Sequence, residues 1–257
     1  MLFARTLLLR NCGRFTHVSS DFGSKYHTHI FVTSEALYAS LTREVTWRHE
    51  SKCIDLEEDS RKTASDDYFL CDYDILKKPI WFIPGVFVDM QLQPLHKQHG
   101  VVDKNDFNVI DEGYPGTGGG GRAYYVPTYG SIESILPNHF LFTCAISPNQ
   151  TELESFTVGQ IFMLGKKRTM MQMMELSKIV TGQRYEGTCT TPYLQIPIEL
   201  LNQFYKYNIL ATTYRYLLIQ GQFRTSLSYW TFNGLSVRGI EQSVSVPEFY
   251  LKDKLLV

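Results

Sequence analysis

The alternation of apolar and polar positions along the chain predicts more strand than helix. Residues 1–9 are predicted as a first strand that ends at Asn11-Cys12-Gly13. Residues 77–95 carry apolar side chains at even positions, which predicts a strand that Pro84-Gly85 interrupts. Further strands are predicted over 124–129, 139–146, 161–176 (a strand pair, or one strand bent at Gly165), 208–223 and 227–237.

Few segments have helical spacing. Apolar side chains recur every three or four residues between 24 and 42, which predicts a helix capped by Ser24. A short helix is predicted at 131–136, and another from Pro197 to Tyr207. A helix from about Met170 is an alternative to the second strand of 161–176, and 247–257 is predicted as a tail or closing strand. Dominant strands with few helices indicate the α+β class.

Composition indicates a folded protein without a membrane span. The 257 residues are 44% hydrophobic and 20% charged, with a net charge of -1. Residues 50–74 hold nine acidic against three basic side chains, so they are predicted as an exposed acidic insertion, and the remainder is mildly basic. No apolar run has membrane-spanning length, and five cysteines lack zinc-ligand spacing, so reduced thiols in the cytoplasm are expected.

Lys166, Lys167 and Arg168 form a cationic triad directly after Gly165. In an extended chain, Lys166 and Arg168 would lie on one face about 7 Å apart, which matches successive phosphates of a nucleic-acid strand. A solvated strand end would explain the same three cations without any function. The triad is therefore a candidate RNA-binding site with a structural alternative.

A glycine-rich stretch at 113–121 precedes Arg122 and the aromatic residues Tyr124, Tyr125 and Tyr129. Aromatic rings beside a cation suit stacking on bases, which makes these four residues candidate RNA ligands. A flexible surface loop and half-buried strand tyrosines are the alternatives. The glycines fit neither nucleotide-binding pattern: no strand-glycine-helix unit surrounds them, and no Ser or Thr follows Gly165-Lys166.

His27 belongs to a His-x-His pair with His29, which is a weak signal for metal or acid–base chemistry and is kept as an RNA-binding candidate. No nucleophile lies in a recognisable elbow, and the carboxylates of the acidic block have no apolar flank that would raise their pKa. The sequence thus predicts no catalytic residue, no metal site and no cofactor. It favours a nucleic-acid-binding protein over an enzyme.

The order of several short motifs resembles a known family. They are 77–84 (KKPIWFIP), 122–130 (RAYYVPTYG), 139–142 (HFLF) followed by 161–167 (IFMLGKK), and 207–210 (YNIL). Together, over roughly residues 1–231, they resemble the Cas-five-like subunit (Csc-one family) of the type I-D CRISPR Cascade complex, in the RAMP superfamily. Two features depart from that family: Lys167-Arg168 replaces its Trp-Met, and the acidic block is an insertion.

The resemblance implies a single RAMP-like domain over 1–257 with a ferredoxin-like core, an antiparallel sheet, a long hairpin or loop excursion near 95–121 and additional C-terminal strands. It also implies a non-catalytic subunit that holds the 5′ handle of the crRNA and helps to position target DNA. Its protein partners would be the Cas-seven-like backbone subunit and the large subunit. The alternatives are a metal-independent endoribonuclease that processes precursor crRNA with a base such as His27 or His29, and a subunit that only bridges proteins.

Overall fold

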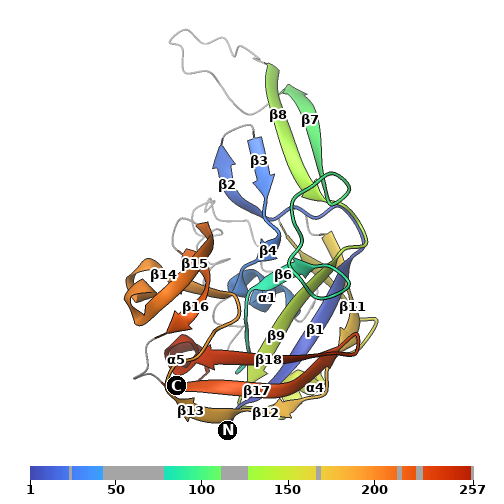
Figure 1. The fold of residues 1–257 in the computed structure, drawn as a ribbon. Helices are drawn as coiled ribbons and strands as arrows, with labels where there is room; N and C mark the ends of the chain where they lie inside the picture. Colours follow the sequence, from blue (N-terminus) through green and yellow to red (C-terminus); the bar gives the residue numbers. More distant parts are fainter. Residues whose placement is uncertain are drawn as a thin grey trace, which may run out of the picture.

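The protein is a body of packed strands from which one small sheet projects (Figure 1). The coordinates are a computed structural model. The structure describes residues 1–22, 25–42, 78–110, 127–165, 169–212, 216–223 and 228–255. The acidic block at 50–74, which we predicted as an exposed insertion, lies outside these residues. In the described part of the chain, no helix is both long enough and apolar enough to cross a membrane.

A central antiparallel sheet is built around β1 (Phe3–Asn11). Its other strands are β4 (Phe31–Val32), β5 (Trp81–Phe82), β6 (Gly85–Val88), β9 (Phe140–Ser147), β10 (Ile161–Leu164), β11 (Thr169–Leu176) and β12 (Val180–Thr181). The strand order is β10-β11-β1-β9-β6-β4, with β5 paired to β9 and β12 to β1. One helix falls between β1 and β6 in sequence and another between β9 and β10. Strands β1, β6, β9 and β11, with one helix between the first two and one between the last two, form a β-α-β-β-α-β unit in the order β11-β1-β9-β6, and β10 adds an edge strand after α4. This arrangement is ferredoxin-like and confirms the predicted fold class.

The two helices pack on one face of this sheet. Helix α1 (Ser34–Leu41) starts where the Thr33 hydroxyl accepts a hydrogen bond from the Ala36 amide, and α4 (Gln150–Glu154) starts at Asn149. Leu7 and Leu9 of β1 share their buried cluster with residues of both helices and the loop after α4, namely Leu37, Leu41, Leu153 and Phe156. Since side chains alternate along β1, Ala4 and Leu8 point to the opposite face.

The C-terminal third covers part of that opposite face. It forms one sheet in the order β13-β17-β18 and a second in the order β14-β16-β15. Leu8 is buried with Leu218 and Val237, and β17 contacts β1. The bounds are β13 (Gln183–Glu186), β14 (Leu194–Pro197), η1 (Ile198–Gln203), β15 (Phe204–Thr212), β16 (Tyr216–Phe223), β17 (Ser228–Val237), β18 (Ile240–Pro247) and α5 (Glu248–Leu255). These are the additional C-terminal strands that we predicted.

A four-stranded sheet, the arm, projects from the body at the top of Figure 1. It consists of β2 (Val18–Phe22), β3 (Lys25–Thr28), β7 (Val102–Ile110) and β8 (Pro127–Ile135), in the order β2-β3-β8-β7. Strands β7 and β8 pair antiparallel from Val102–Ile135 to Ile110–Pro127. Within the excursion predicted near 95–121, Val102–Ile110 therefore forms one strand of a long hairpin, and residues 111–126 lie outside the described residues.

Two helix predictions in the first half of the chain were wrong. Of the helix predicted at 24–42, only α1 exists, because Lys25–Thr28 pairs with β2 and β8 instead. The Thr33 cap replaces the predicted Ser24 cap, and Ser24 lies outside the described residues. The helix predicted at 131–136 belongs to β8, where pairing with β7 along its whole length overrides local helical spacing.

Three predictions in the second half also need correction. The strand-pair alternative for 161–176 is right and the helix from Met170 is wrong, because β11 is held between β10 and β1. The helix predicted from Pro197 to Tyr207 is only the 3₁₀ turn η1, after which the chain enters β15. The predicted tail or closing strand at 247–257 is the helix α5.

Candidate nucleic-acid interface

Most predicted RNA ligands lie outside the described residues. This applies to the cationic triad Lys166, Lys167 and Arg168, and also to Arg122, Tyr124 and Tyr125. The backbone of Tyr129 belongs to β8, opposite Asn108, and exposed His27 belongs to the neighbouring strand β3. Therefore His27 and the backbone of Tyr129 are brought into one sheet, the arm.

The structure brings both flanks of the triad to the base of the arm. The Thr169 hydroxyl donates to the carbonyl of Arg14 at 2.7 Å. On the other side of the triad, Gly165 lies against the carbonyl of Thr16 and the ring of Phe15. Phe15 in turn exchanges backbone hydrogen bonds of 2.9 and 2.8 Å with Ile135, the last residue of β8. We call this meeting of residues 14–17 with Gly165, Thr169 and Ile135 the junction.

Gly165 is required at the junction for two reasons. Its φ of +84° is in the left-handed region, which side chains with a Cβ rarely adopt. A Cβ at this position would lie 2.8 Å from the Thr16 carbonyl oxygen and 3.0 Å from the Phe15 ring. The backbones of Gly165 and Thr16 therefore approach so closely that glycine is required at the position before the triad.

We expect Gly165→Ala to cost about 2 kcal/mol of the free energy of unfolding, because it combines an unfavourable φ with a steric clash. Urea denaturation measures this cost. Gly159→Ala is the matched control, since Gly159 also has a positive φ (+88°) but a Cβ there would meet nothing within 4 Å. Equal destabilisation by the two substitutions would show that contact with residues 15–16 is unimportant.

Charged side chains that sequence reasoning missed surround the junction. Arg14 is about half exposed and pairs with Asp103 of β7 at 2.6 Å. Lys97 donates to Glu133 of β8 at 2.7 Å, and the same carboxylate oxygen accepts the Thr28 amide at 3.0 Å. The ring of His27 lies 3.7 Å from this oxygen. Two ion pairs, Arg14–Asp103 and Lys97–Glu133, thus join segments far apart in sequence where the arm meets the body.

Two histidines beside this cluster are held neutral. Burial lowers the pKa of His17 to about 4, assisted by nearby His29. Burial also lowers the pKa of His29 to about 4, with Lys97 as the next cause. The pKa of Glu133 is lowered, because the bonds from Lys97 and Thr28 and the nearby His27 outweigh its burial. At neutral pH, Glu133 is therefore an anion beside the ammonium group of Lys97, while His17 and His29 are uncharged.

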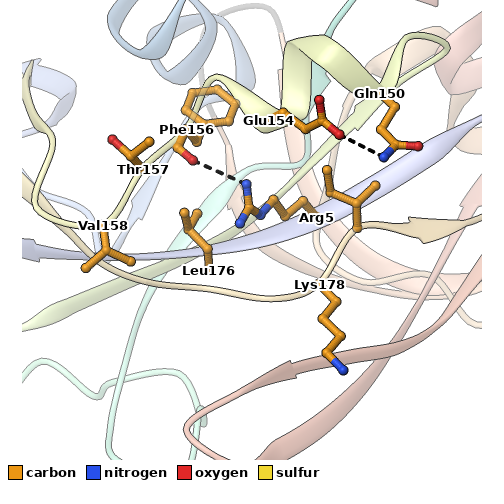
Figure 2. A pocket seen from close by; sticks show the side chains of 9 residues that line it. Arg5, Gln150, Glu154, Phe156, Thr157, Val158, Leu176 and Lys178 are labelled. Atoms are coloured by element: carbon orange, nitrogen blue, oxygen red, sulfur yellow. Dashed lines mark hydrogen bonds between the residues drawn. The ribbon is translucent and has the colours of Figure 1, made fainter.

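A cavity of about 660 Å³ lies elsewhere, between the loop after α4 and the end of β11 (Figure 2). Arg5 lines it, but its guanidinium donates to the carbonyls of Ser177, Leu153 and Phe156 at 2.9 to 3.2 Å. Glu154, which accepts from Gln150, adds a negative charge. The Arg5 guanidinium therefore ties α4 to β1 and to the end of β11, and its hydrogen bonds go to backbone carbonyls of this chain.

No protein-family model and no curated protein matches this chain. Among solved structures, a chain of the Type III-B Cmr-beta bound to cognate target RNA and AMPPnP is similar at 12% identity and a TM-score of 0.43, covering 86% of this chain and 84% of that one. A chain of the same assembly bound to target RNA gives 11% and 0.41, covering 86% and 85%. A CRISPR protein from Archaeoglobus fulgidus gives 8% and 0.38, covering 95% and 99%. The strand order of the central sheet is what defines the fold.

Proposed function

We propose that the chain is a non-catalytic RNA-binding subunit of a type I-D CRISPR surveillance complex. It would hold the 5′ handle of the crRNA, help to position target DNA, and contact the Cas-seven-like backbone and large subunits. The observation that supports the RNA-binding proposal is the junction, which brings Gly165 and Thr169, the residues on either side of the Lys166–Arg168 triad, to the base of the arm. The type of complex rests on the order of motifs in the sequence.

In this proposal the triad neutralises handle phosphates, and Arg14 adds a cation beside it. Splayed bases would stack on the rings of Tyr124, Tyr125 and Tyr129, of which only the last belongs to a strand of the arm, with His27 on the neighbouring strand β3. Phosphate contacts release counterions, so binding should weaken steeply with salt. The proposed role requires no cofactor, because the protein would only hold the crRNA and help to position target DNA.

The test replaces Lys166 and Arg168 by alanine and measures crRNA binding of the assembled complex. We expect the affinity to fall about tenfold at 0.15 M salt, and the slope of log K against log salt to decrease by about 1.4, since two phosphate contacts are lost. Lys178→Ala with Arg184→Ala removes the same charge from exposed sites outside the junction. Equal crRNA binding by the two double variants would overturn the proposal.

The endoribonuclease is the second candidate, because His29 has its pKa lowered to about 4 and lies near Lys97. A neutral imidazole beside an ammonium group is a base–acid pair of the kind used to cleave RNA. Incubating the purified chain with repeat RNA in EDTA separates the two candidates. We expect intact RNA, whereas specific cleavage that His29→Ala abolishes would establish the nuclease.

A further inference from the structure

Strand β15 is exposed in an unusual way. It is the edge strand of the sheet β14-β16-β15, and every residue from Tyr205 to Leu210 is exposed, whichever face it points to. The exposed fraction is 56% for Tyr205 and 49% for both Ile209 and Leu210. A strand of this kind normally keeps large side chains on its buried face. Its solvent-facing rings and cation therefore need an explanation other than packing within this chain.

The segment 204–224, which contains β15 and β16, also has a distinctive charge. Residues 204–224 contain Lys206, Arg215 and Arg224 and no acidic residue, although about one residue in ten of the chain is acidic (26 of 257). The same segment holds four of the 16 tyrosines. A locally positive, tyrosine-rich segment of sequence in a chain of net charge -1 fits a polyanion with stackable rings, and its described cation is Lys206 on β15.

The strand register assembles polar groups on one face. Lys206 lies opposite Gln222 and Asn208 lies opposite Gln220, so these four side chains share a face. Tyr205 is the extra residue at a bulge in this pairing, and its hydroxyl is hydrogen-bonded to the side-chain oxygen of Gln222. The amide nitrogen of Gln222 in turn donates to the Thr190 hydroxyl at 3.2 Å. A ring, an ammonium group and amides are therefore held side by side.

The opposite face differs in character. Tyr207 lies across from Gly221, and Ile209 lies across from Ile219, which is fully buried. A Cβ at position 221 would lie 2.6 Å from the Lys206 carbonyl oxygen and 2.8 Å from the Tyr207 Cβ, so the two strands approach closely here. The side chains on this face lie beside the apolar interior, and none of the described ones is a cation. The two faces of β15 thus provide an internal comparison.

We propose that the face formed by Tyr205, Lys206, Asn208, Gln220 and Gln222 binds a single-stranded nucleic acid. The ring of Tyr205 stacks on a base, and the ammonium group of Lys206 contacts a phosphate. The amides of Asn208 and Gln220 offer both donors and acceptors to a base edge. This surface lies on different strands from the junction, so it is a second contact that stands whether or not the junction holds a crRNA handle.

The experiment uses the full chain carrying Lys166→Ala and Arg168→Ala, so that the triad is weakened. Binding of fluorescein-labelled 20-mers of uridine and of deoxythymidine is followed by anisotropy at several salt concentrations. We expect Tyr205→Ala to weaken binding about tenfold, the effect of losing one stacked base. Lys206→Ala should lower the salt slope by about 0.7, the contribution of one single-strand phosphate contact.

Two controls separate stacking from structure. Tyr205→Phe keeps the ring but loses the bond to Gln222, and should bind within about twofold of the parent if stacking is the main contribution. Tyr207→Ala removes the same side chain from the opposite face and should leave binding unchanged. Thermal unfolding verifies that each variant is folded. Equal losses for Tyr205→Ala and Tyr207→Ala, or no oligonucleotide binding by the parent double variant, would overturn the proposal.

The two oligonucleotides distinguish the sources of such a strand. Preference for the uridine 20-mer would assign the face to RNA, and preference for the deoxythymidine 20-mer would assign it to DNA. Either result supports the site, provided that Tyr205→Ala weakens binding of the preferred oligonucleotide about tenfold. Failure of the proposed crRNA grip would be seen separately, as unchanged handle binding after Lys166 and Arg168 are replaced.

Discussion

Phe15→Ala should lower the free energy of unfolding by about 3–5 kcal/mol, the usual cost of truncating a buried phenylalanine. The Phe15 side chain is fully buried, and its ring centre lies 5.0 Å from that of Phe87. The ring also touches the position before the triad, and the Phe15 backbone is paired with Ile135. Urea denaturation measures the global cost. The local cost should appear as faster hydrogen exchange of the Phe15 and Ile135 amides.

Phe232→Ala is the matched control for this prediction. Phe232 is also fully buried, but it belongs to β17 and to the cluster under the C-terminal strands. We expect a similar loss of stability without faster exchange at Ile135, and crRNA binding that stays near the wild-type value at a temperature where both variants are folded. If the two variants lose crRNA binding equally, the junction does not organise the RNA site.

Most of the fold could be predicted where local pattern and tertiary pairing agree. Residues 139–146 are mostly apolar, and β9 lies in the middle of the sheet, while Gly165 was expected at the bend between two strands. The predictions failed where pairing overrides propensity. Met170 to Glu175 has helix-favouring side chains, yet β11 supplies the link between β10 and β1. Residues 131–136 failed for the same reason, since β7 holds them extended.

The candidate site was less predictable. The triad and His27 could be selected because cations and histidines stand out in sequence. The junction could not, because Thr169 and Arg14 are joined by a hydrogen bond across some 155 positions and share no local pattern. Glu133 was not selected because it lies in a segment predicted as a helix, and Lys97 was not selected because it lies in a predicted polar excursion. Only the strand pairing of the arm shows that their side chains meet.

Acid should weaken the junction through His17. Its pKa is about 4 in the folded protein against 6.5 for the ordinary side chain, so the unfolded chain binds the extra proton between these values. Stability is therefore fully present above pH 6.5 and is lost as the pH falls toward 4. Between pH 7 and pH 4.5 this one group accounts for about 2.5 kcal/mol. His29 and Glu133, whose pKa values are also lowered, act in the same direction.

Urea denaturation of the wild type and of His17→Leu at pH 7 and pH 4.5 tests this prediction. The substitution removes the titrating ring, so the loss between the two pH values should be about 2.5 kcal/mol smaller than in the wild type. His99→Leu is the control, because His99 lies exposed in the turn before β7 and should leave the pH dependence unchanged. If His17→Leu retains the full sensitivity to acid, the burial of His17 is not what makes the base of the arm acid-labile. If it loses that sensitivity while His99→Leu does not, protonation of the His17 ring accounts for that part of the stability lost in acid.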